Sequence, residues 1–162
     1  MGQLDAYPHS GCALVCDHRA MARRDSWASS PGRSRNMRAI RSRDTAPELA
    51  VRRLLHAQGL RYRVDLRPEP TLRRRADIVF TKQRIAIFID GCFWHGCPEH
   101  GRVAFAHNQA YWPDKIQGNI ERDRDTTMRL TEAGWLVLRF WEHQDAEAVT
   151  QQISKTVYSA RG

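Results

Sequence analysis

Residues 84–89, Arg-Ile-Ala-Ile-Phe-Ile, form a nearly continuous apolar run that constrains the fold more than any other segment. A strand exposed to water on one face alternates apolar and polar residues, whereas a continuously apolar strand needs cover on both faces. We therefore expect a central strand with other elements packed against both of its faces. The chain then enters a loop crowded with a carboxylate, cysteines, histidines and adjacent aromatic residues, Asp90 to His100.

Other segments show the patterns of the elements that would surround this strand. Thr45-Ala-Pro-Glu48 has the pattern of a helix capping box, and Gly59 is a natural stop for that helix. The remaining predicted elements are strands at 60–66, 77–80 and 135–141, the last also buried, and helices at 114–133 and from 145 to about 153. The order helix, three strands, helix, strand, helix predicts an α/β fold with a mixed central sheet flanked by helices.

The length of 162 residues suits a single domain with an ordinary core. We assign that domain to residues 33–156. Residues 1–32 show no sustained helix or strand period, so they are predicted to be a disordered or non-native extension, and Met21 is a candidate start. We assign no role to the two cysteines of that extension. Residues 157–162 are predicted to be a tail.

The positive charge of the chain lies in its first half. Residues 1–75 contain sixteen arginines, no lysine and seven acids, a net charge of +9, whereas residues 76–162 carry a net charge of −1. Arginine binds phosphate oxygens through a planar two-pronged donor group, and a one-sided basic field favours a polyanionic partner. We therefore expect the chain to bind nucleic acid.

The sequence lacks the features of a membrane or secreted protein. No apolar run approaches the roughly 20 residues of a membrane span, and the N-terminus lacks the apolar core of a signal peptide. Two of the four cysteines stand beside histidines at metal-ligand spacing, which favours a reduced protein with a zinc site over a disulfide-bonded one. We expect a cytoplasmic protein of bacterial type, associated with the nucleoid.

The spacing Cys92-x4-Cys97-x2-His100 predicts a zinc site. His143, just past the end of a predicted strand, can fold back onto this loop as the fourth ligand, and His107 is its rival. Two thiolates favour zinc over magnesium, and a closed set of four ligands implies a structural site.

His95 is left over from this set, and it lies beside carboxylates. A firmly held imidazole close to a carboxylate is a good general base, although a surface histidine or a substitute ligand is the alternative. Asp77 opens one strand and Asp90 ends the next, so a hairpin would place the two carboxylates together, where they would suit Mg²⁺. Glu48 either completes the capping box with Thr45 or belongs to the active site.

Several strings together resemble the very-short-patch-repair mismatch endonucleases, a branch of the PD-(D/E)xK restriction-endonuclease-like superfamily. The Gly-Cys-Phe-Trp-His and Asn-x-Glu-Arg-Asp-Arg strings are the most specific of them. The matching segments are Ser34 to Ile40, Arg43 to Ala46, Asp77, Phe88 with Gly91 to His95, Lys115 to Arg124, and Gly134 to Glu142. The resemblance implies a restriction-endonuclease-like sheet and a DNA-cutting activity.

The resemblance also assigns roles at the active site. Asp77 would be the main Mg²⁺ ligand, and Ile89 would contribute its backbone carbonyl. Asp90 stands where the family has a histidine beside the metal, which implies a direct or water-mediated metal role. His95 matches the general base that activates the attacking water, and Glu48 matches an acidic active-site residue.

Five further residues match positions that contact DNA in the family. Phe93 and Trp94 match residues that wedge into the duplex beside a T·G mispair, and Met37 matches one inserted from the N-terminal arm. A wobble pair stacks poorly, so apolar wedges open it at a lower unstacking cost than a normal step. Lys115 and Asn119 would contact the mispair or a metal-bound water.

The sequence departs from the family pattern at several positions. Ala76 replaces the proline usual before the catalytic aspartate, and Cys92 stands where the superfamily motif has a lysine, so His95 must carry that function. His143 stands where a cysteine is expected among the zinc ligands. The run Arg73-Arg-Arg75 also differs and is expected to alter DNA contacts or sequence context.

We therefore expect a monomeric Mg²⁺-dependent, zinc-stabilised endonuclease that nicks one DNA strand at T·G mispairs left by deamination of 5-methylcytosine. Such a nick starts very short patch repair, and other mismatch-repair proteins are candidate partners. The alternatives are a restriction-type or mobile-element nuclease of the same fold and a non-catalytic zinc-containing DNA-binding module.

Overall fold

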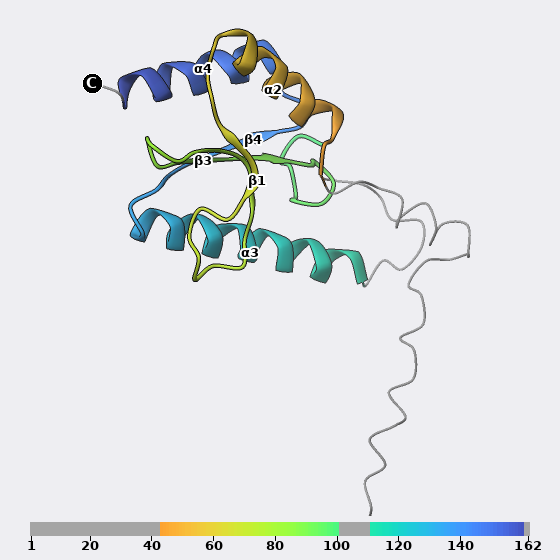
Figure 1. Cartoon of the computed structure of the whole chain (residues 1–162). Helices are drawn as coiled ribbons and strands as arrows, with labels where there is room; N and C mark the ends of the chain where they lie inside the picture. Colours follow the sequence, from red (N-terminus) through yellow and green to blue (C-terminus); the bar gives the residue numbers. More distant parts are fainter. Residues whose placement is uncertain (1–42, 101–110, 161–162) are drawn as a thin grey trace, which may run out of the picture.

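The computed structural model describes residues 43–100 and 111–160. Its elements, with the labels of Figure 1, are α2 (Ala46–Ala57), β1 (Arg63–Leu66), β2 (Ala76–Phe80), β3 (Ile85–Asp90), α3 (Tyr111–Glu132), β4 (Leu136–Trp141) and α4 (Ala146–Ser159). This is the predicted order of helices and strands. The predicted N-terminal extension lies outside the described residues.

The four strands form one mixed sheet in the order β1-β2-β3-β4. β1 and β2 are antiparallel, as are β2 and β3, whereas β3 and β4 are parallel with Ile89 opposite Phe140. The connection between β3 and β4 passes through α3, so both strands end at the same edge of the sheet (Figure 1).

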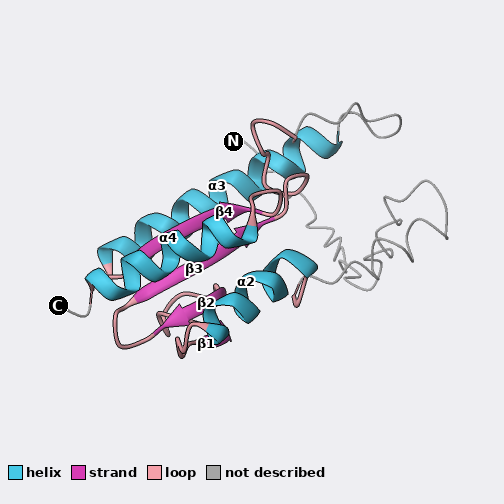
Figure 2. Cartoon of the chain, turned by 90° about the horizontal axis from the view of Figure 1, so that it is seen from above, coloured by secondary structure: helices cyan, strands magenta, loops and turns pink. Residues whose placement is uncertain are grey.

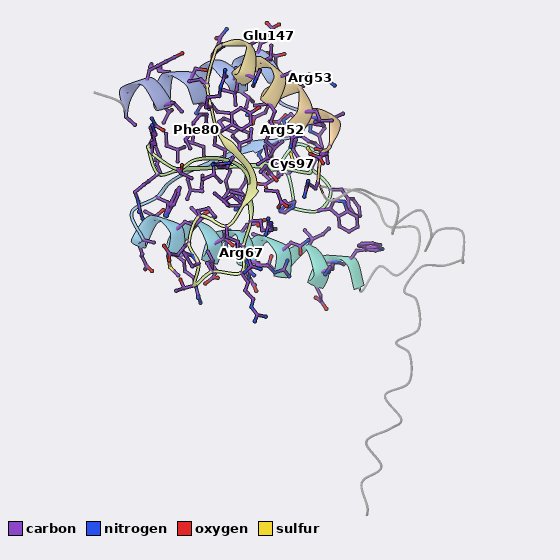
Figure 3. All side chains as sticks on the ribbon, viewed as in Figure 1. Arg52, Arg53, Arg67, Phe80, Cys97 and Glu147 are labelled. Carbon is purple, nitrogen blue, oxygen red and sulfur yellow. The ribbon has the colours of Figure 1, made fainter. Side chains whose placement is uncertain are left out.

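Helices cover both faces of this sheet, as the apolar run of β3 predicts. α2 and α4 pack on one face and α3 on the other (Figures 1 and 2). Phe80, Ile87 and Ile153 belong to the core beneath α2 and α4, where Figure 3 shows Phe80 between the sheet and the helices. Ala86 and Leu130 belong to the core beneath α3. Neighbouring residues of β3 thus enter opposite cores, and each buried Leu, Ile or Phe contributes roughly 1.5–3 kcal/mol.

The structure corrects three of the predicted elements. β4 is an edge strand with Leu136 48% exposed, so the prediction of a second buried strand was wrong, because an apolar run alone does not reveal how many neighbours a strand has. β1 begins at Arg63 rather than Leu60. α4 continues to Ser159, and Val157 is fully buried, so the predicted tail begins inside this helix.

In the described part of the chain, no helix has both the length and the apolar character needed to cross a membrane.

Candidate active site and metal centre

The predicted catalytic residues meet at one edge of the sheet. A cavity of about 520 Å³ opens there, between the N-terminus of α2, the ends of β2, β3 and β4, and the middle of α3. Glu48, Asp77, Asp90 and His95 all line it. They come from three segments far apart in the sequence, so the fold brings together the four residues to which a catalytic role was assigned.

Asp77 lies against the backbone of Ile89. The paired residues of β2 and β3 run from Phe80 opposite Ile85 to Ile78 opposite Ile87. Beyond that point a side chain of β2 bonds to the backbone of β3: Asp77 Oδ2 accepts a hydrogen bond of 2.7 Å from the Ile89 N–H. A carboxylate next to this stretch of backbone offers the hard oxygen ligands that Mg²⁺ prefers, so Asp77 and the Ile89 carbonyl fit the ion.

The surroundings of Asp77 favour its protonated form in the absence of a cation. Burial is the main cause that raises the pKa of Asp77 to about 7, and the charges of Glu48 and Asp90 raise it further. The hydrogen bond from Ile89 acts in the opposite direction. A cation placed among these carboxylates would relieve both the repulsion and the desolvation of the charge.

Glu48 contacts the residues at the start of α2 and also lines the cavity. It is only 4% exposed, and it accepts hydrogen bonds of 2.9 Å from the Asp44 N–H and 2.8 Å from the Thr45 hydroxyl. The Thr45 side chain itself makes no capping bond to α2. The Glu48 carboxylate thus holds the start of the helix, in a variant of the predicted capping box, and also lines the cavity.

His95 belongs to a closed network with two carboxylates and an arginine. Its Nδ1 lies 2.5 Å from Asp123 Oδ2 and 3.7 Å from Asp90 Oδ1. Arg139 binds Asp90 through both prongs, Nε to Oδ2 at 2.7 Å and Nη2 to Oδ1 at 2.8 Å, and Nη2 also lies 2.9 Å from Asp123 Oδ1. Because Nδ1 donates to Asp123, Nε2 is the ring nitrogen that remains to accept a proton from water.

The network also sets the protonation of its members. Burial lowers the pKa of His95, but the hydrogen bond with Asp123 and the charge of Asp90 outweigh it and raise the pKa above its ordinary value of 6.5. Burial raises the pKa of Asp123, but the hydrogen bond with His95 and the charge of Arg139 outweigh it and lower the pKa. Asp123 is therefore ionised near neutral pH and orients the imidazole.

Asp123 and Arg139 were missed by the sequence reasoning. Asp123 lies in the Asn-x-Glu-Arg-Asp-Arg string, which carried the family resemblance although only Asn119 in it received a role. Arg139 is the single charge in the apolar run 135–141, and a charge among buried neighbours is the signal that could have marked it. Two metal roles were predicted for Asp90, direct and water-mediated. Because Arg139 binds both oxygens of Asp90, the water-mediated role fits better.

Cys92, Cys97, His100 and His143 form the predicted cluster of four ligands. Cys92 Sγ lies 3.0 Å from His143 Nδ1, and Cys97 Sγ lies 3.7 Å from the same atom and 3.9 Å from His100 Nδ1. All four donor atoms lie within 4.8 Å of one another, and both cysteines are free. A zinc tetrahedron needs ligand atoms roughly 3.3–3.8 Å apart, so this set fits Zn²⁺. His107, the rival ligand, lies outside the described residues.

The loop that carries this cluster is tightly folded at the end of the sheet, where Figure 3 labels Cys97. The Cys97 N–H donates to the Cys92 carbonyl at 3.0 Å, and the His95 N–H donates to the Gly91 carbonyl at 3.1 Å. Gly96 has φ +67°, and a Cβ there would lie 2.7 Å from the Ile120 side chain of α3. The turn therefore needs glycine, which lets His95 and Cys97 sit close to the helix.

The two thiols of the cluster differ in acidity. Burial and the neighbouring Cys97 raise the pKa of Cys92 to about 11. Burial also acts to raise the pKa of Cys97, but hydrogen bonds from the backbone of His100 and Glu99 outweigh it and lower the pKa. Zinc binding would remove the thiol protons of this pair, since thiolates are the metal-bound form.

Phe93 and Trp94, the predicted wedge, belong to a cluster of three aromatic rings. Their centroids are 4.9 Å apart, and the Trp112 ring of α3 lies 5.4 Å from Phe93 and 5.9 Å from Trp94. All three side chains are half-buried. Trp112 had no role in the sequence reasoning, because an aromatic residue in the first turn of a helix has no distinctive pattern.

The other predicted DNA-binding residues are placed differently from one another. Asn119 is 8% exposed, its Nδ2 donates to the Trp94 carbonyl at 2.8 Å, and its Oδ1 accepts from Arg122 at 2.8 Å. Asn119 therefore holds the loop that carries Phe93 and Trp94 against α3. Lys115 is exposed on α3, and Met37 lies outside the described residues.

Comparison with known proteins places the chain among DNA-cutting enzymes. The family model described as DNA mismatch endonuclease Vsr matches residues 25–100. The type II nicking enzyme V.NaeI of Lentzea aerocolonigenes is 45% identical over 149 residues, which cover 86% of this chain and 89% of that protein. The DNA mismatch endonuclease Vsr of Escherichia coli K12 is 45% identical over 113 residues, which cover 68% of this chain and 69% of that protein.

Among solved structures, the catalytic domain of the homing endonuclease I-Bth0305I aligns with a TM-score of 0.49 at 20% sequence identity, over 74% of this chain and 100% of that one.

The close relatives and the matching family model define the chain as a DNA endonuclease, and DNA as its substrate. It belongs to the Vsr family of DNA mismatch endonucleases, as the resemblance of its sequence motifs had implied.

Proposed function

We propose that this endonuclease nicks one strand of duplex DNA beside a T·G mispair and thereby starts very short patch repair of deaminated 5-methylcytosine. The observation that carries the proposal is that the Phe93 and Trp94 rings lie on the same loop as His95. Phe93 and Trp94, which would open a weakly stacked base-pair step, directly precede His95, the general base that would activate water. Recognition and cleavage are therefore built on one rigid segment.

The carboxylates of the cleft supply the second part of the proposal. Asp77 and the Ile89 carbonyl would hold Mg²⁺, and Asp90 would reach it through water. The ion would polarise the phosphodiester and stabilise the charge on the leaving 3′ oxygen. His95 accepts the proton of the attacking water at Nε2, while Asp123 holds Nδ1 and stabilises the imidazolium that forms.

Zinc would serve as a brace for this segment. Its proposed ligands Cys92 and Cys97 lie on either side of Phe93, Trp94 and His95, and His143 ties the loop to the end of β4. Fixing both ends of so short a loop keeps the wedge and the general base in one relative position before DNA arrives. Positioning of this kind lowers the cost of reaching the reactive geometry.

The proposal can be tested with labelled duplexes that contain a single T·G pair at varied flanking sequence. In Mg²⁺ the wild-type protein should cut only the strand that carries the mispaired thymine, and a T·A duplex of the same sequence should stay intact. Asp77→Asn should abolish nicking while leaving affinity for the T·G duplex within about threefold, because the substitution preserves an acceptor for Ile89. Asp125→Asn, which removes an exposed carboxylate of α3 outside the cavity, is the matched control.

Cleavage of both strands, or equal cleavage of T·G and T·A duplexes, would instead indicate a restriction-type nuclease of the same family. Binding without cleavage by the wild-type protein would indicate a DNA-binding module.

A further inference from the structure

We propose that Arg74 binds a backbone phosphate of the nicked strand inside the active-site cleft. This assignment rests on the proposed function, since it takes duplex DNA as the molecule that enters the cavity. Arg74 precedes β2 and lines the same cavity of about 520 Å³ as Glu48 and Asp77.

Arg74 has a buried donor without an acceptor among the described residues. Its Nε is inaccessible to water and has no hydrogen-bond partner in residues 43–100 and 111–160. A charged N–H group buried in this way is destabilising until an acceptor reaches it. No residue in the described part of the chain supplies that acceptor, and the cavity that Arg74 lines gives an incoming anion access to it.

The other arginines of the cavity each already have an acceptor. Arg75 is bound to Asp65, with Nε 2.6 Å from Oδ1. Arg139 is held by Asp90 and Asp123, and Arg122 donates to the Asn119 side chain. No ion pair joins Arg74 to any carboxylate in the described ranges. Among the arginines that line the cavity, Arg74 is therefore the one with no acceptor in the described residues.

The acidic residues of the cavity also call for a cation that meets the DNA backbone. The cavity wall includes five acidic side chains, Glu48, Asp77, Asp90, Asp123 and Glu142. These carboxylates repel an approaching phosphodiester unless a cation neutralises its charge. A metal at Asp77 would do so only for the phosphate that is cut. The guanidinium matches two phosphate oxygens with parallel donors, so Arg74 is suited to grip a phosphate of the same strand as it passes the carboxylates.

The test compares Arg74→Gln with Arg73→Gln. Arg73 is the adjacent residue, carries the same charge, is exposed and does not line the cavity. Binding of each variant to the T·G duplex is measured without Mg²⁺ between 50 and 200 mM salt. Loss of one phosphate contact should make the slope of log affinity against log salt less steep by about 0.9. Between 50 and 200 mM salt, the fold loss of affinity should therefore be about 3.5 times smaller for Arg74→Gln than for wild type. Arg73→Gln should keep the wild-type slope.

A chemical cycle locates the contact. Neutral methylphosphonates are placed one at a time along the nicked strand, and one position should weaken wild-type binding but leave Arg74→Gln unaffected. Arg74→Lys should recover the salt slope but only part of the affinity, because it restores the charge without the two-pronged geometry. The melting temperature of Arg74→Gln should equal or exceed that of wild type, since no contact is lost with the unpaired donor.

The proposal is overturned if Arg74→Gln and Arg73→Gln have the same salt slope, or if every methylphosphonate weakens wild type and Arg74→Gln equally. A fall in the melting temperature of Arg74→Gln would show a structural role and would also overturn it. These readouts measure binding and stability, so they stay decisive for Arg74 even if the wild-type protein does not prefer T·G mispairs for nicking.

Discussion

Replacing Asp77 with asparagine should stabilise the metal-free protein above neutral pH even though it abolishes nicking. Burial and the neighbouring carboxylates raise the pKa of Asp77 from 3.8 to about 7. Between these two values the folded protein keeps a proton that the unfolded chain has released. The free energy of unfolding therefore falls as pH rises from about 4 to about 7 and stays at its lower value above that.

The magnitude follows from the size of the shift. About three pKa units at 1.36 kcal/mol each amount to about 4 kcal/mol of destabilisation at pH 8, as an order of magnitude. Asparagine carries no charge but keeps an oxygen that accepts the hydrogen bond from the Ile89 N–H. Asp77→Asn should therefore match wild type near pH 4 and exceed it by about 4 kcal/mol at pH 8.

Urea unfolding followed by tryptophan fluorescence, in buffers without Mg²⁺ and without chelator, measures this difference at each pH. Effects of pH on the zinc ligands are common to both proteins and cancel in the comparison. Glu132→Gln, an exposed carboxylate at the end of α3, is the control and should show no comparable gain. The reasoning is refuted if Asp77→Asn is no more stable than wild type at pH 8, or if its advantage is the same at pH 4.

Three further predictions concern the rest of the site. Elemental analysis should find one zinc per wild-type chain, and Cys97→Ser should lose it. Cys97→Ser should also lower the melting temperature by about 7 °C, the shift for about 2 kcal/mol, whereas Cys12→Ser should change neither. Trp112→Ala should weaken binding to the T·G duplex about 10- to 100-fold more than binding to the T·A duplex, because it removes a ring that packs against Phe93 and Trp94. An equal loss of affinity for both duplexes would contradict that role. The rate of nicking should fall at acid pH with a midpoint above 6.5, set by the raised pKa of His95. Arg139→Met should move that midpoint upward, because the Arg139 charge opposes protonation of His95, and a downward shift would contradict this account.

The elements and the meeting of the distant ligands could be predicted from the sequence. The apolar run of residues 84–89 required a strand covered on both faces, and helices lie on both faces. A strand, a helix and another strand in sequence favour parallel strands that end at one edge. That placed His143 next to the Cys92–Cys97 loop, and the structure brings them together.

Side-chain partners between elements could not be predicted, because they depend on register and on the packing of α3 against the sheet. Arg139 stands in an apolar run that predicts only a strand, and its contact with Asp90 follows from the parallel register of β3 and β4. A run of three arginines likewise does not reveal that Arg75 pairs with Asp65 while Arg74 Nε has no acceptor among the described residues. The edge position of β4 was missed for a related reason, since the hydrophobicity of a strand does not reveal how many strands pair with it.

The charges divide the cleft into two parts that respond differently to a metal ion. Asp90 and Asp123 are compensated by Arg139 and, in part, by His95, so their geometry is set before any ligand binds. Asp77 faces Glu48 and Asp90 without a bound arginine, and its raised pKa shows that its charged form is unfavourable there. The raised pKa of Asp77 therefore marks it as a carboxylate that a cation would stabilise. Because a carboxylate binds Mg²⁺ only after losing its proton, we expect the apparent affinity for Mg²⁺ to weaken below about pH 7, while the hydrogen bond between His95 and Asp123 persists. A metal affinity that did not change between pH 6 and pH 8, measured by calorimetry on the DNA-free protein, would show that Asp77 is not the residue through which the ion is bound.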